Sequence, residues 1–268
     1  MYTSKCLFSV SVAILLVFLA AAATFALDKD IMLYLPFDEG NGDQVSDQSG
    51  HGNNGVIKGN PGWVEGKLGN ALEFNGTSDF VEVANSATLN ITDAVTVLAW
   101  IQLSKDWYPA QYGNIAGINR VGGQTADAYY LNVGYYSREH DKVSMGIIGE
   151  GVAETPLQGK TPVLQGEWVF VAGVFSGGKF MRVYLNGELD NELTSVPDKI
   201  QATTDTPFTV GAIAGSTDYS FQGTIDEVVV YSRALTTEEI KSIMARGIAS
   251  VQFAGKLTVA WGEVKGDF

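Results

Sequence analysis

The sequence predicts an all-β protein: a jelly-roll-like sandwich of two antiparallel sheets with one short helix on its C-terminal side. Three observations predict this class. Short runs of β-branched and aromatic residues recur along the chain, turn residues separate them closely, and a helical pattern occurs once, late in the sequence. The chain shows no internal repeat and no long linker, so one domain over residues 27–268 is expected.

Residues 1–26 have the pattern of an export signal. Lys5 precedes a long apolar run that ends in small residues up to Ala26. This order is typical of a secretory signal peptide that is removed on export, and a retained N-terminal anchor is the alternative because the apolar run is long. The one cysteine, Cys6, lies in this segment, so the mature chain must be stabilised without disulfides.

The charge balance bears on possible partners. The sequence has 17 basic and 30 acidic residues, a formal net charge of −13 at pH 7, and loss of Lys5 with the signal makes it more negative. Such a charge argues against nucleic acid or an anionic membrane surface as partner, and it suits binding of a cation. The mature chain has no second apolar run long enough to span a bilayer. We therefore expect a secreted, periplasmic or cell-surface protein.

The expected strands follow one another from residue 31 to residue 231. They are 31–37, 71–74, 80–83, 95–101, 128–137, 141–149, 167–175, 180–185, 208–213 and 224–231. The fifth and sixth form a predicted hairpin, and Asn186-Gly187 after the eighth is a strong hairpin-turn signal. Residues 46–55 are a predicted loop, and residues 104–127, the least regular stretch, are a predicted surface loop.

One helix is predicted at about 237–246. Thr236 can cap its first turn, and Glu239 stands three residues later, which completes a capping box. Gly247 is a natural stop. The apolar stripe consists of Ile240, Ile243 and Met244. We expect this helix to pack on the outside of the sheets, and we expect a last strand at about 256–264.

Several motifs occur in an order that resembles a known family. Phe37-Asp38-Glu39 ends the first strand, an Asp-x-Ser-Gly-x-Gly-Asn loop spans residues 47–53, and a Gly-Lys-x-Gly-x-Ala-Leu-x-Phe segment begins at Gly66. The later markers are Ala99-Trp100, Trp168, Tyr184-Leu185-Asn186-Gly187 and Gly223-Thr-Ile-Asp-Glu-Val. Over about 31–247 the chain resembles laminin-G-like domains of the concanavalin A-like lectin/glucanase superfamily.

This resemblance implies a jelly-roll of two curved sheets that often carries a structural calcium ion. It implies no single activity, because the fold hosts lectins, adhesion modules and glycanases. In such domains calcium binds near the chain ends, and the corresponding residues here are Asp38, Asn75 and Asp226. Asp38 and Asp226 would supply charge and the Asn75-Gly76 turn a carbonyl, toward the roughly six to eight oxygens that calcium prefers.

Asp226 raises a physical problem that calcium would solve. Strict alternation along the strand puts Asp226 on the same face as Val228 and Val230, aimed at an apolar layer. A buried carboxylate is costly unless it is paired. The alternative to calcium is that Asp226 accepts backbone N–H bonds in a turn.

The sequence offers no clear catalytic acid pair. Glycanases of this superfamily commonly carry Glu-x-Asp-x-(x)-Glu on one strand, so that the acids share a face. Asp226 and Glu227 are adjacent, and Glu188, Asp190 and Glu192 follow the hairpin turn, where a solvated face is the simpler interpretation. We therefore expect no glycanase activity, and the alternative is a glycoside hydrolase with an unrecognised acid pair.

Aromatic residues crowd the middle of the chain and favour a sugar-binding role, because exposed rings can stack on sugars. The predicted ligand-binding residues are Trp107, Tyr108, Tyr112 and Tyr130. The alternative is that these rings are ordinary core residues of a sandwich. The preferred interpretation is an exported, non-enzymatic, lectin-like module for a glycan or other extracellular polymer, stabilised by structural calcium. An adhesion module with a protein partner is a further alternative.

Overall fold

The computed structural model describes residues 28–107, 112–119, 127–134, 141–214, 216 and 219–248. The predicted signal peptide and the strand predicted at 256–264 lie outside these residues. Within the described part of the chain, none of the helical structure is long and apolar enough to cross a membrane.

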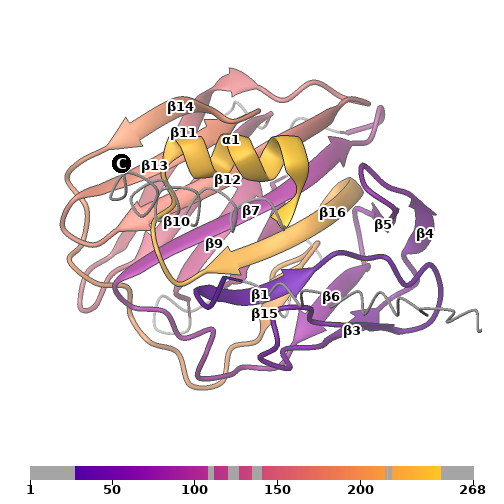
Figure 1. Cartoon of the computed structure of the whole chain (residues 1–268), viewed down its shortest axis with the longest axis horizontal. Helices are drawn as coiled ribbons and strands as arrows, with labels where there is room; N and C mark the ends of the chain where they lie inside the picture. The colour runs from indigo at the N-terminus through magenta and orange to yellow at the C-terminus, as the bar shows by residue number, and fades with distance from the viewer. Residues whose placement is uncertain are drawn as a thin grey trace, which may run out of the picture.

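Two antiparallel sheets pack face to face, as predicted, in a jelly-roll sandwich of the concanavalin A-like type (Figure 1). Sheet A contains β1 (Ile31–Leu35), β4 (Gly62–Glu65), β5 (Asn70–Asn75), β7 (Ala94–Leu103), β12 (Trp168–Ser176), β13 (Phe180–Leu185), β14 (Glu188–Leu193) and β16 (Gln222–Tyr231). Its order is β14-β13-β12-β7-β16-β5-β4, and β1 also pairs with β16.

Sheet B contains the remaining strands. They are β2 (Gln44–Val45), β3 (Gly55–Lys58), β6 (Phe80–Val83), β8 (Gly113–Ile118), β9 (Tyr129–Val133), β10 (Lys142–Ile148), β11 (Glu154–Pro162) and β15 (Phe208–Val210). Their order is β11-β10-β9-β8-β15-β6-β3-β2. Several neighbouring strands, such as β1 with β16, β7 with β16 and β8 with β15, are distant in sequence, so long-range pairing helps to hold both sheets together.

The core lies between the sheets, and a second apolar layer lies outside sheet A. Val97, Ala99 and Ile101 of β7 enter the core between the sheets. Leu98 and Trp100, on the opposite face of β7, belong to the outer layer beneath α1 (Thr237–Arg246). Strand β7 is therefore buried on both faces, which explains its nearly continuous apolar sequence.

The helix α1 has the ends that its sequence predicts. The Thr236 side chain accepts a hydrogen bond from the Glu239 N–H, and the Glu239 side chain accepts one from the Thr236 N–H, which confirms the capping box. Gly247 follows with a φ of 76°. Ile240 and Ile243 are buried in the outer layer of sheet A, so the helix packs on the outside of the sandwich, as expected.

The two predicted hairpins are also present. Strands β9 and β10 pair antiparallel, and β13 pairs with β14 across Asn186-Gly187. Asn186 and Gly187 have φ angles of 50° and 78°. Positive φ at both central residues is typical of the tight hairpin turn that the Asn-Gly dipeptide favours.

The prediction of a surface loop over residues 104–127 is wrong for part of that stretch. Residues 113–118 form β8, and all six are buried inside sheet B. Gly117 lies where strands β8 and β9 are closely packed, because a Cβ there would lie 2.5 Å from the Tyr129 carbonyl oxygen and from the Tyr130 Cα. The glycine is required by close strand packing and not by a turn.

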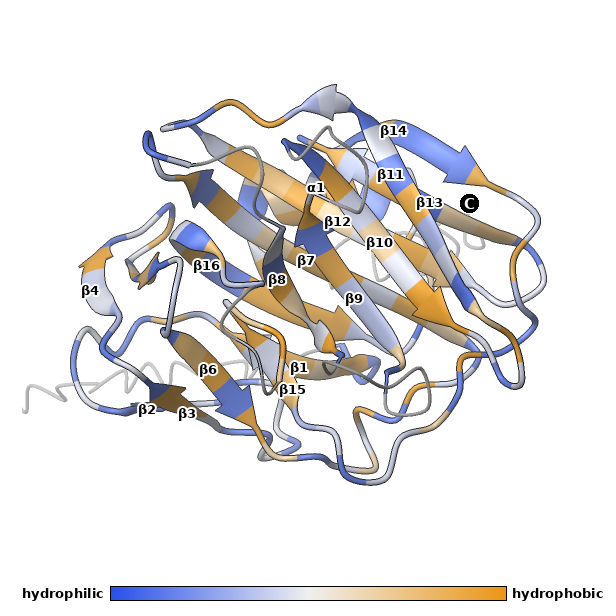
Figure 2. Cartoon of the chain, turned by 180° about the vertical axis from the view of Figure 1, so that it is seen from behind, coloured by the Kyte–Doolittle hydropathy of each residue, from blue (hydrophilic) through white to orange (hydrophobic). Residues whose placement is uncertain are grey.

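The two outer faces of the sandwich differ in character. Sheet A is covered by apolar side chains and α1. In Figure 2, which views the molecule from the opposite side to Figure 1, strands β8, β9 and β10 lie in front and alternate between hydrophilic and hydrophobic residues. The outward residues of these strands include Asn114, Asn132 and Ser144.

Candidate functional site

A β-bulge in β16 decides where Asp226 points. Asp226 lies opposite Trp100 of β7, and the register then shifts so that two residues of β16 oppose one of β7. The extra residue, Glu227, has a φ of 55°, which is uncommon outside glycine. The prediction that Asp226 shares a face with Val228 and Val230 is therefore wrong. Asp226 follows the core residue Ile225 and faces the outer side of sheet A, and the bulge after it brings Val228 and Val230 back to the core.

The turn between β4 and β5 covers the Asp226 carboxylate. The Leu68 N–H donates to Asp226 Oδ2 at 2.9 Å, and the backbones of Lys67 and Glu227 also hydrogen-bond to the carboxylate. Gly66 permits this approach, because a Cβ there would lie 2.7 Å from Oδ2. Asp226 is fully buried, yet its Oδ1 has no hydrogen-bond partner. Backbone N–H bonds in a turn thus account for one carboxylate oxygen and leave the other unused.

Two further carboxylates belong to this region, and we call Asp38, Asp226 and Glu227 the acidic cluster. Asp38 Oδ1 accepts the Asn70 N–H at 3.1 Å, so Asp38 meets the same β4–β5 turn. Glu227 accepts a hydrogen bond from the Tyr34 hydroxyl at 3.0 Å. Asp38 and Asp226 therefore converge on one turn, and the Glu227 carboxylate lies against β1.

Burial and mutual repulsion raise the pKa values of two carboxylates of the acidic cluster. Burial is the main cause that raises the pKa of Asp226 to about 6, and the charge of Asp38 adds to it. Burial likewise raises the pKa of Glu227 to about 7, with contributions from Asp226 and Asp38. None of the three forms an ion pair with a described basic residue. The cluster is therefore electrostatically unfavourable unless protons or a cation compensate it.

The donor chemistry of the acidic cluster suits a hard cation, although its side chains alone do not complete a site. No group of three or more acidic, histidine or cysteine side chains in the described ranges is arranged to hold a metal ion. Asp226 Oδ1 is a buried carboxylate oxygen without a partner, which is the kind of ligand that calcium takes. Main-chain oxygens and water would have to supply the other ligands.

Asn75 does not join the acidic cluster. It ends β5 opposite Gln222, four residues from Asp226 along β16, which corresponds to roughly 13 Å along a strand. Its Oδ1 accepts the Thr77 N–H at 2.8 Å and the Ser78 N–H at 3.0 Å. Of the three predicted metal ligands, the structure brings together Asp38 and Asp226 and leaves Asn75 in a separate turn.

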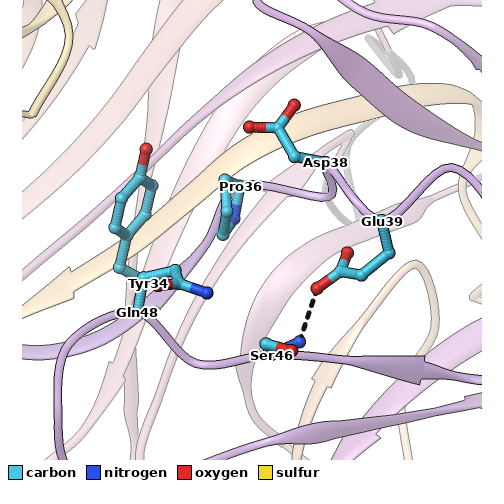
Figure 3. Close-up of a pocket in the computed structure, with 6 residues that line it drawn as sticks. All are labelled: Tyr34, Pro36, Asp38, Glu39, Ser46 and Gln48. Atoms are coloured by element: carbon cyan, nitrogen blue, oxygen red, sulfur yellow. Dashed lines mark hydrogen bonds between the residues drawn. The ribbon is translucent and has the colours of Figure 1, made fainter.

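A hollow of about 530 Å³ borders the acidic cluster (Figure 3). Its lining residues are Tyr34, Pro36, Asp38, Glu39, Ser46 and Gln48. The carboxylates of Asp38 and Glu39 point away from one another in Figure 3. Glu39 Oε1 accepts the Ser46 N–H at 2.7 Å, so Glu39 is tied to its neighbouring loop and does not extend the cluster.

The four aromatic residues predicted to bind a ligand have different surroundings. Trp107 and Tyr130 are only 3% and 2% exposed. Tyr112 is half-buried and makes an edge contact with Tyr219, with ring centroids 5.0 Å apart. Tyr108 lies outside the described residues. Trp107 and Tyr130 thus offer little ring surface for stacking on a sugar.

The alternating acids of β14 are held in structural contacts. Glu188 pairs with Lys241, and Glu192 pairs with Arg182. Asp190 accepts the Thr161 hydroxyl at 2.6 Å, which ties β14 to β11 of the other sheet. These contacts agree with the interpretation of β14 as an ordinary hairpin strand.

A row of polar side chains lies on the outer face of sheet B and was not predicted from the sequence. Asn114 of β8 lies opposite Asn132 of β9, and Asn132 lies opposite Ser144 of β10. Directly opposed residues share a face, and the neighbours Leu131 and Met145 enter the core, so this polar row faces outward. All three side chains are nevertheless fully buried.

Much of the hydrogen-bonding capacity of the polar row is unused. Neither Nδ2 nor Oδ1 of Asn132 has a partner, and Ser144 Oγ has none. Asn119 Oδ1, near Asn114, is also unpartnered. Asn114 donates to the Ala212 carbonyl at 2.7 Å and is held in place. Buried polar groups are nearly always hydrogen-bonded, so both ends of this amide need a partner, which a buried water or a ligand would supply.

Tyr130 lies directly beside the polar row. Its ring passes over Gly146 of β10, where any Cβ would collide with it. Its hydroxyl donates to Glu154 at the start of β11. Burial, and then the charge of Asp127, raise the pKa of Glu154. Tyr130 and Asn132 are two residues apart in β9 and therefore share this face.

Comparison with known proteins agrees with this architecture. A family model described as the concanavalin A-like lectin/glucanases superfamily matches residues 75–241. No match was found among curated proteins.

Solved structures with a similar fold include several binding domains. Domain 4 of a GH43 extracellular arabinanase from Geobacillus stearothermophilus, in complex with arabinotriose, has a TM-score of 0.61 at 19% identity, covering 80% of this chain and 98% of that one. The binding domain of Paraclostridial Mosquitocidal Protein 1 has a TM-score of 0.64 at 13% identity, covering 80% and 52%. The receptor-binding domain of botulinum neurotoxin C/D mosaic serotype has a TM-score of 0.62 at 16% identity, covering 81% and 51%.

These similarities bear on the fold alone. The chain matches nearly the whole arabinanase domain and only about half the length of each toxin domain.

Proposed function

The chain belongs to the concanavalin A-like lectin/glucanases superfamily, and we propose that it is an exported, non-enzymatic binding module for a glycan or another extracellular polymer. Similar folds occur in a domain solved with arabinotriose and in toxin domains that bind receptors. The export signal pattern of residues 1–26 supports a location outside the cytoplasm.

The observation that carries this proposal is the polar row on sheet B. The outer face of sheet A is occupied by α1 and an apolar layer. The outer face of sheet B instead buries Asn132 and Ser144 with unused donors and acceptors. Each such group costs free energy in the absence of a partner, which supports a binding role for this face.

We further propose that one calcium ion stabilises the module at the acidic cluster. Asp38 and Asp226 would bind it, together with main-chain oxygens and water. The free Oδ1 of buried Asp226 and the raised pKa values of Asp226 and Glu227 support this assignment. The ion would connect the end of β1 to β16 in a mature chain that contains no cysteine.

A glycan array probed with the full mature chain tests the proposed function. Binding to a family of related glycans, reproduced by calorimetry with the free oligosaccharide, is the expected result. Release of reducing sugar from the bound polysaccharide, lost on mutation of one carboxylate, would identify an enzyme instead. Absence of binding across the array would remove the glycan proposal and favour a protein partner.

A further inference from the structure

We propose that the outer face of sheet A carries a second binding site, beside the end of β7, for a small zwitterion that bears one ammonium and one carboxylate group. A free α-amino acid is the simplest ligand of this class. The site lies on the opposite side of the sandwich from the polar row, so it goes beyond the proposed function and does not depend on glycan binding.

The outer face of sheet A becomes polar beyond the part that α1 covers. In Figure 1, the end of β7 and the start of β16 extend past α1 toward β5. Gln102 of β7 lies opposite Thr224 of β16, and Thr224 lies opposite Glu73 of β5. The neighbouring residues Ile101 and Ile225 enter the core, so these three polar side chains share the outward face.

A hollow of about 410 Å³ is lined by Gln102, Thr224 and Glu73, and also by Lys105. Small-molecule sites typically have volumes of about 300–1,000 Å³. Lys105 follows the end of β7, and its side chain passes Gly166, where a Cβ would lie 3.1 Å from Lys105 Cε. Because β16 separates β5 from β7, Glu73 and Lys105 border the hollow from different sides.

The uncharged polar groups of the hollow have unused hydrogen-bonding capacity. Thr224 is only 6% exposed, and its hydroxyl makes no hydrogen bond to a described residue. Gln102 Nε2 donates to the Gly166 carbonyl oxygen at 3.1 Å, which holds the amide in place, and Gln102 Oε1 accepts no hydrogen bond within the described residues. The hollow leaves room for water at these groups in the free protein, and a ligand that replaces this water gains both acceptors.

Glu73 and Lys105 give the hollow two opposite charges. Neither forms an ion pair with any residue in the described part of the chain. A ligand that places its ammonium group toward Glu73 and its carboxylate toward Lys105 pairs with both. A ligand with a single charge would instead be repelled by one of the two side chains.

The row of acceptors also matches the three N–H donors of an ammonium group. The Glu73 carboxylate, the Thr224 hydroxyl and Gln102 Oε1 lie on three adjacent strands and can all accept a hydrogen bond. Lys105 is the only basic side chain that lines the hollow among the described residues, so it selects the carboxylate of the ligand.

NMR titration of the mature protein with each of the common free L-amino acids, at low ionic strength, tests the site. The backbone amide signals that report on the hollow are those of Lys105, Gly166, Gly223 and Thr224. The amino acid that binds best is then compared with its amide, which lacks the carboxylate, and with its N-acetyl form, which lacks the ammonium group. We expect both derivatives to bind about tenfold more weakly or worse.

Three variants remove one contact each: Glu73→Gln, Lys105→Met and Thr224→Val. Glu65→Gln and Lys179→Met are the matched controls, because both residues are exposed and do not line the hollow. We expect the first two variants to weaken binding about tenfold, with Thr224→Val weakening it in the same direction and both controls leaving it unchanged. Added sodium chloride should weaken binding of the wild type, because both charges are exposed.

Two results would overturn the proposal. One is that no amino acid shifts the amide signals of the hollow. The other is that the amide and the N-acetyl form bind as tightly as the parent amino acid, or that Glu73→Gln and Lys105→Met bind it as tightly as the wild type. Because the hollow and the polar row lie on different sheets, a glycan array without binding would leave this site standing, and failure here would leave the proposed function standing.

Discussion

Asp226 lies directly opposite Trp100 across the β16–β7 ladder, on the outer side of sheet A, and the residue after it, Glu227, is an extra residue in β16. Ile225 and Val228 both enter the core, which strict alternation along the strand would not allow. Asp226 lies under the β4–β5 turn, near Asp38, and the Glu227 carboxylate lies against β1. The first two predictions concern the charge of this acidic cluster.

Calcium is expected to stabilise the wild type through the acidic cluster. A ligand that binds only the folded state adds about 2.7 kcal/mol at a hundred times its dissociation constant. Chelator should therefore lower the melting temperature by several degrees and calcium should restore it, as measured by calorimetry. Asp226→Asn should abolish the difference, whereas Asp106→Asn, at an exposed loop position, should retain it. Identical melting of the stripped wild type in chelator and in calcium would exclude the ion.

The stability of the metal-stripped protein should fall as the pH rises. Asp226 and Glu227 have reference pKa values of 3.8 and 4.5, and burial raises them to about 6 and about 7 in the folded state. The folded state therefore binds more protons than the unfolded state between these values. The stabilisation present below about pH 4 is lost as the pH rises through about 6 and 7.

Urea unfolding at about pH 5 and about pH 8 checks this sign, with the midpoint expected at higher urea at about pH 5. Asp226→Asn combined with Glu227→Gln should flatten the dependence. A midpoint that rises toward about pH 8, or an unchanged slope in the double variant, would show that other groups control it.

A feature of the fold could be predicted from the sequence where its cause lies in neighbouring residues. The helix ends at Thr236 and Gly247 and the hairpin at Asn186-Gly187 follow from neighbouring residues, so they could be predicted. The bulge at Glu227 could not, since a positive φ at glutamate is imposed by pairing with β1 and β7 and has no local signal. Strand β8 was hidden for a similar reason, because Gly117 suits both a turn and close strand packing.

The two candidate sites differ in the same way. Asp38 and Asp226 were found because family motifs contain them, and the structure brings them to one turn. The polar row requires the register of three strands, since Asn132 and Ser144 become neighbours only when β9 pairs with β10. Alternation along β9 shows which of its residues share a face with Tyr130, but it does not show which residues of the paired strands lie beside them.

Gly117→Ala should destabilise the fold, because the new methyl group would press against the backbone of β9. Overpacking in a tightly packed interior typically costs about 1–3 kcal/mol. The matched control is Gly62→Ala in β4, where the nearest atom to the new Cβ is 3.9 Å away. Urea unfolding should separate the two variants. Equal stability of both would contradict the tight packing of β8 on β9.

Arg233→Lys should cost stability at the junction of the N-terminal segment and α1. The guanidinium contacts Asp28 at 2.8 Å, Glu239 at 2.8 Å and Asp30 at 3.4 Å. A lysine cannot reproduce this fork, so we expect a loss of about 1 kcal/mol or more. Lys199→Ala is the control, because its single pair with Asp93 is well exposed and should contribute about 0–1 kcal/mol. A smaller loss for Arg233→Lys than for Lys199→Ala would contradict the network.

The central claim is that the ligand binds on the outer face of sheet B, at the polar row. Hydrogen exchange of the wild type, measured by mass spectrometry with and without the best array glycan, tests it most directly. We predict slower exchange in peptides that cover β9 and β10, and no change in β1 or β16. Protection confined to β1, β16 and the β4–β5 turn would place the ligand at the acidic cluster and contradict the claim.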